Sequence, residues 1–231
     1  IYTLMIIHFV LVEPLYPENI GAAARAIKTM GFNSLRLVNP CNHLAEPARW
    51  LAHGSIELLE EAGVFNTFDQ AVEDIDFIIG TTSKIRTIKQ DYYPANKIYS
   101  LIQDKKESIK NLALVFGGEE SGLSNKILKK CHIASSIPMK SKYPSLNLAQ
   151  SVMVYAYSVS GLDNTIPEST DNINQILSYK ELRSKTKEIL NKIDIKSSTN
   201  IHSRIMERMA ILGQDDINLL HSICNELNRK I

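Results

Sequence analysis

The residues Asn19-Ile-Gly-Ala-Ala-Ala-Arg25 form a run of small side chains that ends in an arginine. An apolar run at 6–12 precedes it, and a second one at 35–38 follows it. Alanine favours helix, and Gly31 stands where a helix commonly ends. The pattern therefore predicts a strand, a helix over 20–30 and another strand, which together make one βαβ unit.

Short apolar runs and helical patterns keep alternating along the first two thirds of the chain. Apolar runs at 77–80 and 112–116 each end in glycine, and a further strand is expected at 137–139. Helical patterns occupy 56–61 and 99–103. This alternation predicts an α/β domain with a mostly parallel sheet covered by helices.

Three segments follow predicted strands of this sheet and are rich in small and polar residues. They are Thr81-Thr82-Ser83, Gly117-Gly118-Glu119 and the loop after Ile137. In open parallel sheets, ligands bind outside the carboxyl ends of the strands. Small residues there let a ligand approach the backbone closely. The three segments are therefore the predicted ligand site.

Two nucleotide-binding classes are disfavoured. Gly117 and Gly122 have the spacing of a phosphate-binding loop, but Leu123 stands where that motif requires Lys before its Ser or Thr, so ATP or GTP binding loses its key cation. A dinucleotide fold needs its glycine fingerprint directly after the first strand. This chain has Glu13-Pro14-Leu15-Tyr16-Pro17 at that place.

The composition is that of an ordinary globular protein. The 231 residues are 44% hydrophobic and 22% charged, and the formal net charge of +1 gives no global argument for a nucleic-acid partner. The three cysteines lack metal-site spacing and predict reduced packing residues, with no metal. The apolar run at 4–12 is too short to span a membrane, so we expect a cytoplasmic protein without membrane attachment.

The pattern changes after Gly161. Residues 162–177 are polar and asparagine-rich, which predicts a linker between a domain over 1–161 and a helical C-terminal extension over 178–231. Three amphipathic helices are expected in the extension, and their apolar stripes must pack on each other, on the main domain or on a partner. Its first helix carries basic residues that form either a solvated face or a contact to an RNA backbone, namely Lys180, Arg183, Lys185 and Lys187.

The segment Pro144-Ser145-Leu146-Asn147-Leu148-Ala149 precedes a long apolar helix that runs to Val159. Ser145 and Asn147 are both good helix caps. Taken with the earlier segments, however, the order Asn-x5-Arg, Phe-Gly-x-Glu-x-x-Gly-Leu and Pro-x-Ser-Leu-Asn-Leu-Ala resembles the SPOUT superfamily of RNA methyltransferases, in its 2′-O-methyltransferase branch. The resemblance covers about residues 6–160.

Within that branch the chain is most similar to a bacterial tRNA/rRNA methyltransferase group. This group contains LasT-type proteins and the related tRNA cytidine/uridine anticodon-loop 2′-O-methyltransferases. The stretches 36–40, 48–54 and 150–155 look more like the LasT type. One departure is Gly118, where the anticodon-loop enzymes usually carry arginine, so the resemblance does not fix the RNA substrate.

The resemblance implies a fold that periodicity does not reveal, a deep C-terminal trefoil knot. It also implies S-adenosylmethionine as cofactor, bound in the knot mainly by backbone groups. The cofactor positions that match are Thr81, Thr82, Ser83, Gly117, Ile137, Pro144, Ser145 and Leu146.

The resemblance further implies attack by a ribose 2′-hydroxyl on the cofactor's methyl group, with no metal. The matching catalytic positions are Arg25, Asn19, Glu119, Ser145 and Asn147. A guanidinium is a poor base, so we expect Arg25 to anchor phosphate and activate the hydroxyl.

The implied partners are RNA and a second copy of the chain. Among RNAs, tRNA is expected ahead of rRNA. The second copy forms a homodimer that brings Arg25 to the other subunit's cofactor. Two alternatives stay open at this point. One is an RNA-binding protein that keeps the fold without methyl transfer, and the other is methylation of a base atom.

Overall fold

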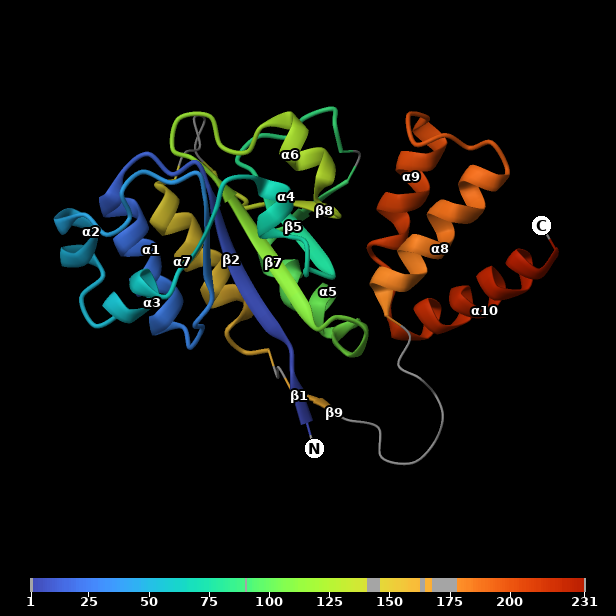
Figure 1. Ribbon diagram of the computed structural model, residues 1–231, viewed down its shortest axis with the longest axis horizontal. Coiled ribbons are helices and arrows are strands. Elements are labelled where there is room, and N and C mark those ends of the chain that lie inside the picture. The colour runs from blue at the N-terminus through green and yellow to red at the C-terminus, as the bar shows by residue number, and fades with distance from the viewer. Residues whose placement is uncertain (1, 90, 141–145, 163–164, 168–177, 231) are drawn as a thin grey trace. The chain divides into compact units, whose positions relative to one another are not determined.

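The structure, a computed structural model, describes residues 2–89, 91–140, 146–162, 165–167 and 178–230 (Figure 1). The chain divides into two compact units. The large unit comprises Ile6–Tyr99 and Asn111–Leu162. The small unit comprises Ile1–Met5, Ser100–Lys110 and Asp163–Ile231. No helix within the described ranges is long and apolar enough to cross a bilayer.

Seven strands of the described chain form the sheet of the large unit, and all their pairings are parallel. In order across the sheet they are β4 (Gly63–Phe65), β3 (Leu35–Val38), β2 (Ile6–Val12), β7 (Asn111–Gly117), β5 (Phe77–Thr81), β8 (Ile133–Ser136) and β6 (Tyr92–Pro94). The predicted parallel α/β sheet is confirmed. The strand expected at 137–139 is wrong, because the chain pairs through 133–136 and then meets Pro138, which has no N–H to donate.

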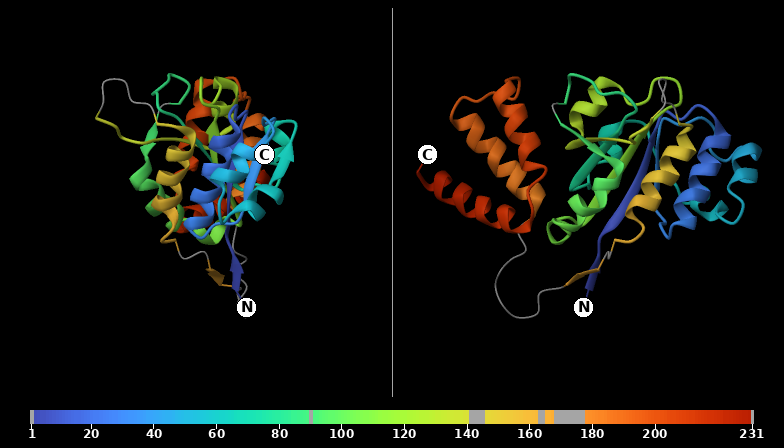
Figure 2. Two further views of the ribbon diagram at one scale, coloured as in Figure 1. Left: turned by 90° about the vertical axis from the view of Figure 1, so that its left-hand side faces the viewer. Right: turned by 180° about the vertical axis from the view of Figure 1, so that it is seen from behind.

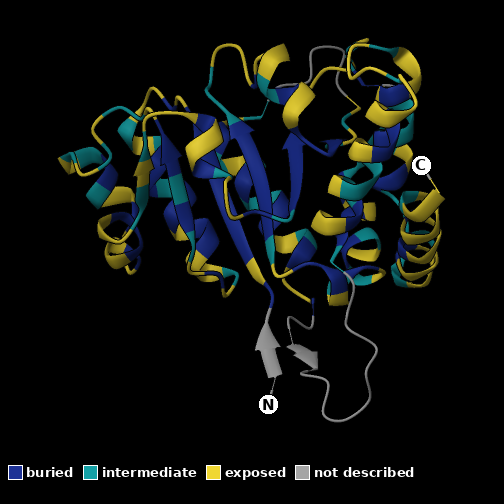
Figure 3. Cartoon of the chain, turned by 45° about the vertical axis from the view of Figure 1, so that its right-hand side comes forward, coloured by how far each residue is buried: buried dark blue, intermediate teal, exposed yellow. Residues whose placement is uncertain are grey.

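The two faces of the sheet are covered by different helices. The helices of this unit are α1 (Pro17–Thr29), α2 (Glu46–Leu51), α3 (Ile56–Glu60), α4 (Phe68–Ala71), η1 (Ala95–Lys97), α6 (Asn125–Lys130) and α7 (Leu148–Val159), and α5 (Ile98–Gln103) begins in it. On one face Val10 belongs to a buried cluster with Phe68 of α4 and Leu128 of α6. On the other, the Phe116 ring meets Tyr155 of α7 edge-on, 5.6 Å between centroids. The central strands are buried on both sides (Figure 3).

The small residues of α1 have a packing reason. α1 begins at Pro17, earlier than predicted, because proline suits the first helical position. A Cβ added at Gly21 would lie 2.1 Å from the carbonyl oxygen of Ala48, so glycine lets α2 pack directly against α1. Gly31 follows the helix with φ of +86°, as its place in the sequence predicts.

The described part of the small unit contains three complete helices, α8 (Tyr179–Lys192), α9 (Asn200–Met209) and α10 (Gln214–Lys230), and most of α5. Ser178 and Thr199 cap the first two by accepting hydrogen bonds from backbone N–H groups. The unit also holds the 3-10 turn η2 (Lys106–Ser108) and a two-stranded antiparallel sheet of β1 (Tyr2–Leu4) and β9 (Thr165–Pro167). β9 thus lies inside the segment that the sequence predicts as a linker.

A lysine is fully buried within the small unit. Lys105 is 0% exposed, and its ammonium group donates to the carbonyl oxygen of Ala210. The same nitrogen lies 5.7 Å from the centre of the Tyr179 ring. Burial lowers the pKa of Lys105 to about 7, although the nearby Asp104 carboxylate opposes this shift.

This lysine makes the stability of the small unit depend on pH. In the unfolded chain Lys105 has its ordinary pKa of 10.5, so between about pH 7 and 10.5 the unfolded state binds more protons than the folded state. Stability therefore rises with pH across this window, by at most about 1.4 kcal/mol per pH unit from this residue. We expect Lys105→Met to flatten the rise in urea midpoint measured between pH 6 and 9. Parallel curves for the two proteins would contradict this prediction.

Candidate active site

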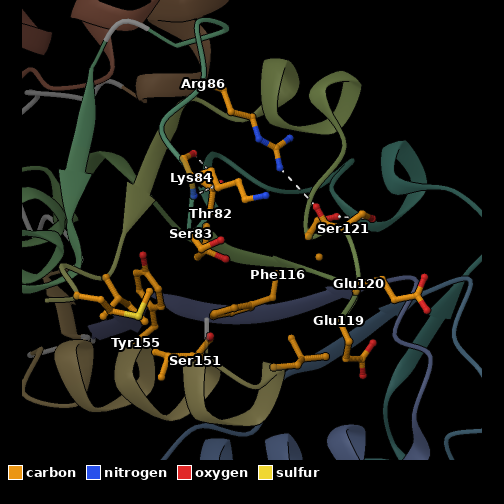
Figure 4. A pocket seen from close by; sticks show the side chains of 18 residues that line it. Thr82, Ser83, Lys84, Arg86, Phe116, Glu119, Glu120, Ser121, Ser151 and Tyr155 are labelled. Atoms are coloured by element: carbon orange, nitrogen blue, oxygen red, sulfur yellow. Dashed lines mark hydrogen bonds between the residues drawn. The ribbon is translucent and has the colours of Figure 1, made fainter. Parts of the chain in front are cut away.

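A pocket opens at the carboxyl ends of β5 and β7 and beside the segment after β8 (Figure 4). Its volume is about 330 Å³. The lining residues come from all three predicted segments, and they are Thr81, Thr82, Ser83, Lys84, Arg86, Phe116, Gly117, Gly118, Glu119, Glu120, Ser121, Gly122, Ile137, Met139, Leu146, Leu148, Ser151 and Tyr155. This volume and the mixture of apolar and polar groups are typical of a small-molecule site.

Residues 117–122, the glycine loop, fold back on themselves at one wall of the pocket. The Gly122 N–H donates to the Gly118 carbonyl oxygen at 2.9 Å, and Gly122 has φ of +63°. A Cβ added at Gly117 would lie only 2.0 Å from the carbonyl carbon of Gly122. The loop can close this tightly only because both positions are glycine.

Gly118, the departure from the anticodon-loop enzymes, also has a structural reason in this chain. A Cβ added there would lie 2.4 Å from the carbonyl oxygen of Glu13, which is backbone and cannot swing away. The loop therefore takes a path in this protein that leaves no room for a side chain at position 118.

The segment after β5 is shaped by its own hydroxyl groups. The Thr81 hydroxyl donates to the Val115 carbonyl oxygen at 2.9 Å, which ties the end of β5 to β7. The Thr82 hydroxyl donates to the Lys84 carbonyl oxygen and accepts from the Lys84 N–H, at 3.0 and 3.2 Å. Because both hydroxyls are engaged in these bonds, the segment offers a ligand mainly its backbone groups and Ser83.

A chain of hydrogen bonds joins one residue from each of the three motifs. Glu119 accepts from the Asn19 amide nitrogen at 2.6 Å and, through its other oxygen, from the Leu15 N–H at 2.9 Å. The Asn147 amide nitrogen donates to Asn19 Oδ1 at 2.7 Å. Asn147 is also the N-cap of α7, accepting from the Ala149 N–H at 2.8 Å. Its capping role and its place in this network are therefore compatible.

The other predicted site residues are distributed as follows. Ile137 and Leu146 line the pocket, whereas Pro144 and Ser145 lie outside the described residues. Arg25 is exposed on α1 and is not among the lining residues of its own chain.

Sequence reasoning missed several lining residues, of which Tyr155 and Arg86 are the most tightly held. The Tyr155 hydroxyl donates to Ser135 Oγ at 2.8 Å, and burial raises its pKa. Its four-residue spacing from Ser151 on α7 was a usable signal, because both must face the same side of a helix. Arg86 had no such signal, since it lies in an irregular segment.

Comparison with known proteins fits this geometry. Residues 6–157 match the SpoU rRNA Methylase family, and residues 177–231 match the C-terminal domain of the tRNA/rRNA methyltransferase LasT. The chain belongs to the SpoU rRNA methylase family. The predicted family resemblance is thereby confirmed.

Several members of the family are similar over much of the chain. An uncharacterized tRNA/rRNA methyltransferase LasT of Escherichia coli is 35% identical over 98% of this chain and 99% of its own length. The tRNA (cytidine/uridine-2′-O-)-methyltransferase TrmJ of Sodalis glossinidius is 38% identical over 66% of this chain and 60% of its own. The solved structure of a probable methylase family protein from Haemophilus influenzae has a TM-score of 0.64 at 28% identity and covers 97% of this chain and 96% of its own.

The Glu119 contacts give a direct test of the network in this SpoU-family site. In Glu119→Gln an NH₂ group replaces one of the two accepting oxygens and faces another donor, from Leu15 or Asn19. Losing a hydrogen bond to a charged group costs about 1.5–3 kcal/mol. We expect kcat/KM for methyl transfer to fall about ten- to hundredfold. Glu46→Gln, at the exposed first position of α2 and not among the pocket-lining residues, is the matched control, and an equal loss in both variants would contradict the prediction.

Proposed function

We propose that this chain transfers a methyl group from S-adenosylmethionine to a ribose 2′-hydroxyl of RNA, with tRNA as the first candidate substrate. The chain is a methyltransferase by family, and its TrmJ relatives are named as tRNA 2′-O-methyltransferases. The observation that carries the proposal is the hydrogen-bond chain that joins Asn19, Glu119 and Asn147 beside a pocket at the strand ends. These relatives disfavour the non-catalytic alternative.

The residues present fit the cofactor. A volume of about 330 Å³ accommodates a nucleoside with a methionine tail, and the Thr82 and glycine-loop segments present backbone groups to it. The lining residues carry both signs of charge, with Lys84 and Arg86 in the segment after β5 and Glu119 and Glu120 in the glycine loop (Figure 4). Bound S-adenosylmethionine would supply an activated methyl group on a good leaving group.

The protein's own task is then to align a weakly acidic hydroxyl with that methyl group and help remove its proton. In this proposal Arg25 anchors the RNA phosphate and activates the hydroxyl, because its guanidinium stays charged. Asn19, which donates to Glu119, and Asn147, which donates to Asn19, shape the ribose side of the pocket in this proposal. Ser145 is assigned to the same cofactor and ribose pocket by motif match alone.

We also propose that the large unit is tied in a trefoil knot and functions as a homodimer. Two features support the knot. β8 lies between β5 and β6 in the sheet although both of these strands precede it in the chain, and α7 then comes back to pack beside α1 and β7 (Figure 2). The exposure of Arg25 outside its own chain's pocket lining supports the dimer, since a second subunit would bring this residue to the cofactor. A monomer at micromolar concentration in sedimentation that still transfers methyl groups would refute the dimer.

The domain boundaries and the location belong to the proposal as well. We assign 1–161 to the methyltransferase domain, 162–177 to a linker and 178–231 to a helical extension that enlarges the RNA footprint, and we place the protein in the cytoplasm. Truncation after Gly161 tests whether the extension contacts RNA. Unchanged RNA affinity of the truncated protein would show that it does not.

The substrate class is tested with labelled S-adenosylmethionine and RNA from cells that lack this gene. Purified tRNA and rRNA are offered separately, so that label in one pool alone identifies the substrate. We expect label in tRNA. Label only in rRNA would assign rRNA as the substrate instead of tRNA. No label in either RNA would favour the alternative of an RNA-binding protein without methyl transfer.

A further inference from the structure

We propose that Arg86 is a positioning residue that holds the glycine loop in the shape that accepts the cofactor. The inference rests on the proposed function, because it takes S-adenosylmethionine as the occupant of the pocket. It goes further by assigning control of cofactor affinity to a residue of the segment after β5 that none of the recognised motifs contains.

The guanidinium of Arg86 reaches across the pocket to the far end of the glycine loop (Figure 4). Its Nη1 donates to the Leu123 carbonyl oxygen at 2.7 Å and to Asn125 Oδ1 at 2.8 Å. Its Nη2 donates, more weakly, to the Ser121 carbonyl oxygen at 3.4 Å. Two of the three acceptors are backbone oxygens, so this side chain fixes the path of the loop itself.

Arg86 is in turn held in place by the sheet. Its N–H donates to the Tyr92 hydroxyl at 2.8 Å, and that hydroxyl donates back to the Arg86 carbonyl oxygen at 2.8 Å. Tyr92 belongs to β6, where it pairs with Ala134 of β8, and its side chain packs against the buried core. The guanidinium is therefore presented from a segment that is anchored at both backbone polar groups.

The glycine loop depends on such a support. Glu119 ties its middle to Leu15 and Asn19, and the Gly122 N–H closes the turn onto the Gly118 carbonyl oxygen within an isolated β-bridge. Glycine gives the loop many alternative conformations, which must be given up when the ligand binds. Arg86 restrains the end that Glu119 does not hold, and pre-organisation of this kind raises affinity without a direct contact to the reacting atoms.

The chemistry favours positioning over catalysis. An arginine offers a planar fork of donors that can reach several oxygens at once, whereas lysine offers a point charge. In Arg86 the fork is directed at protein oxygens. We therefore expect Arg86→Lys to recover part of what Arg86→Ala loses, since lysine can still reach one carbonyl.

The test compares the full-length parent with Arg86→Ala, Arg86→Lys and the exposed α6 control Lys129→Ala. Amide hydrogen exchange without ligand is measured first. We expect Arg86→Ala to speed exchange at the Gly122 amide at least about tenfold, while amides of β7 keep their protection. Steady-state kinetics and calorimetry follow, with an expected rise of about tenfold or more in KM and Kd for S-adenosylmethionine, little change in kcat, and partial recovery in Arg86→Lys.

Three results would overturn the inference. Unchanged exchange at Gly122 would show that Arg86 does not hold the loop. Faster exchange with unchanged cofactor affinity would show that holding the loop does not matter for binding. A fall in kcat with KM for the cofactor unchanged would assign a catalytic role instead. If the parent protein itself binds no S-adenosylmethionine, the proposed function is refuted. A loss of cofactor affinity in the Arg86 variants alone does not refute it.

Discussion

Arg25→Ala is expected to reduce the rate of methyl transfer about a hundred- to a thousandfold while the protein still folds and binds cofactor. Arg25 is exposed on α1, so its removal leaves no cavity in the core. The magnitude is that of losing one group that stabilises developing charge in a transition state. Single-turnover transfer with saturating cofactor measures it. Lys28→Ala, one turn further along α1 and paired with Glu57, is the matched control.

The same variant tests whether Arg25 acts across subunits. Mixing Arg25→Ala with a variant that cannot bind cofactor creates heterodimers in which one site has an intact pocket and receives Arg25 from the other subunit. Random mixing of equal amounts should restore about a quarter of the parent activity, since half of the dimers are mixed and each has one intact site. Activity that stays at the level of the separate variants would contradict action in trans.

Gly117→Ala is expected to lower affinity for S-adenosylmethionine at least about a hundredfold, which makes it the natural second partner in that mixture. The added methyl group would lie 2.0 Å from the Gly122 carbonyl carbon and 2.1 Å from the Leu123 nitrogen. Both atoms are backbone, so the glycine loop must open to accommodate it. Calorimetric titration with the cofactor measures the loss, and far-ultraviolet circular dichroism checks the fold.

Gly161→Ala is the control for this substitution. The nearest atom to a methyl group there is a ring carbon of Tyr99 at 3.6 Å, an ordinary contact distance. We expect its cofactor affinity to equal that of the parent. If Gly117→Ala binds the cofactor as tightly as the parent does, the glycine loop does not form part of the cofactor site.

Local sequence predicted most of the sheet because its strands carry their own signal. The run at 6–12 is apolar enough to be buried on both faces, and Gly31 marks the end of α1 by its φ of +86°. The strand at 133–136 was missed because the more apolar Ile137 and Met139 drew the prediction past it. The pairing of β1 with β9 could not be foreseen, since strands of three residues have no periodicity to read.

The candidate site was predictable only where spacing or motif carried it. Asn19 is 100 positions from Glu119 and 128 positions from Asn147, the two residues to which it is hydrogen-bonded. Only the order of the motifs suggested that these three residues meet. The contacts of Arg86 depend on the exact path of two irregular segments, and no local rule encodes such a path. Burial of Lys105 has the same origin, because a lysine is expected at the surface until tertiary packing covers it.

The position of the methyl group in the product distinguishes ribose methylation from methylation of a base. RNA labelled by the parent protein is digested to nucleosides and analysed by mass spectrometry, with a parallel alkaline hydrolysis. A methyl group on a ribose 2′-oxygen blocks cleavage at that linkage, so we expect a 2′-O-methyl nucleoside and an alkali-resistant dinucleotide carrying the label. A label found on a base, or released with ordinary mononucleotides after alkali, would contradict it.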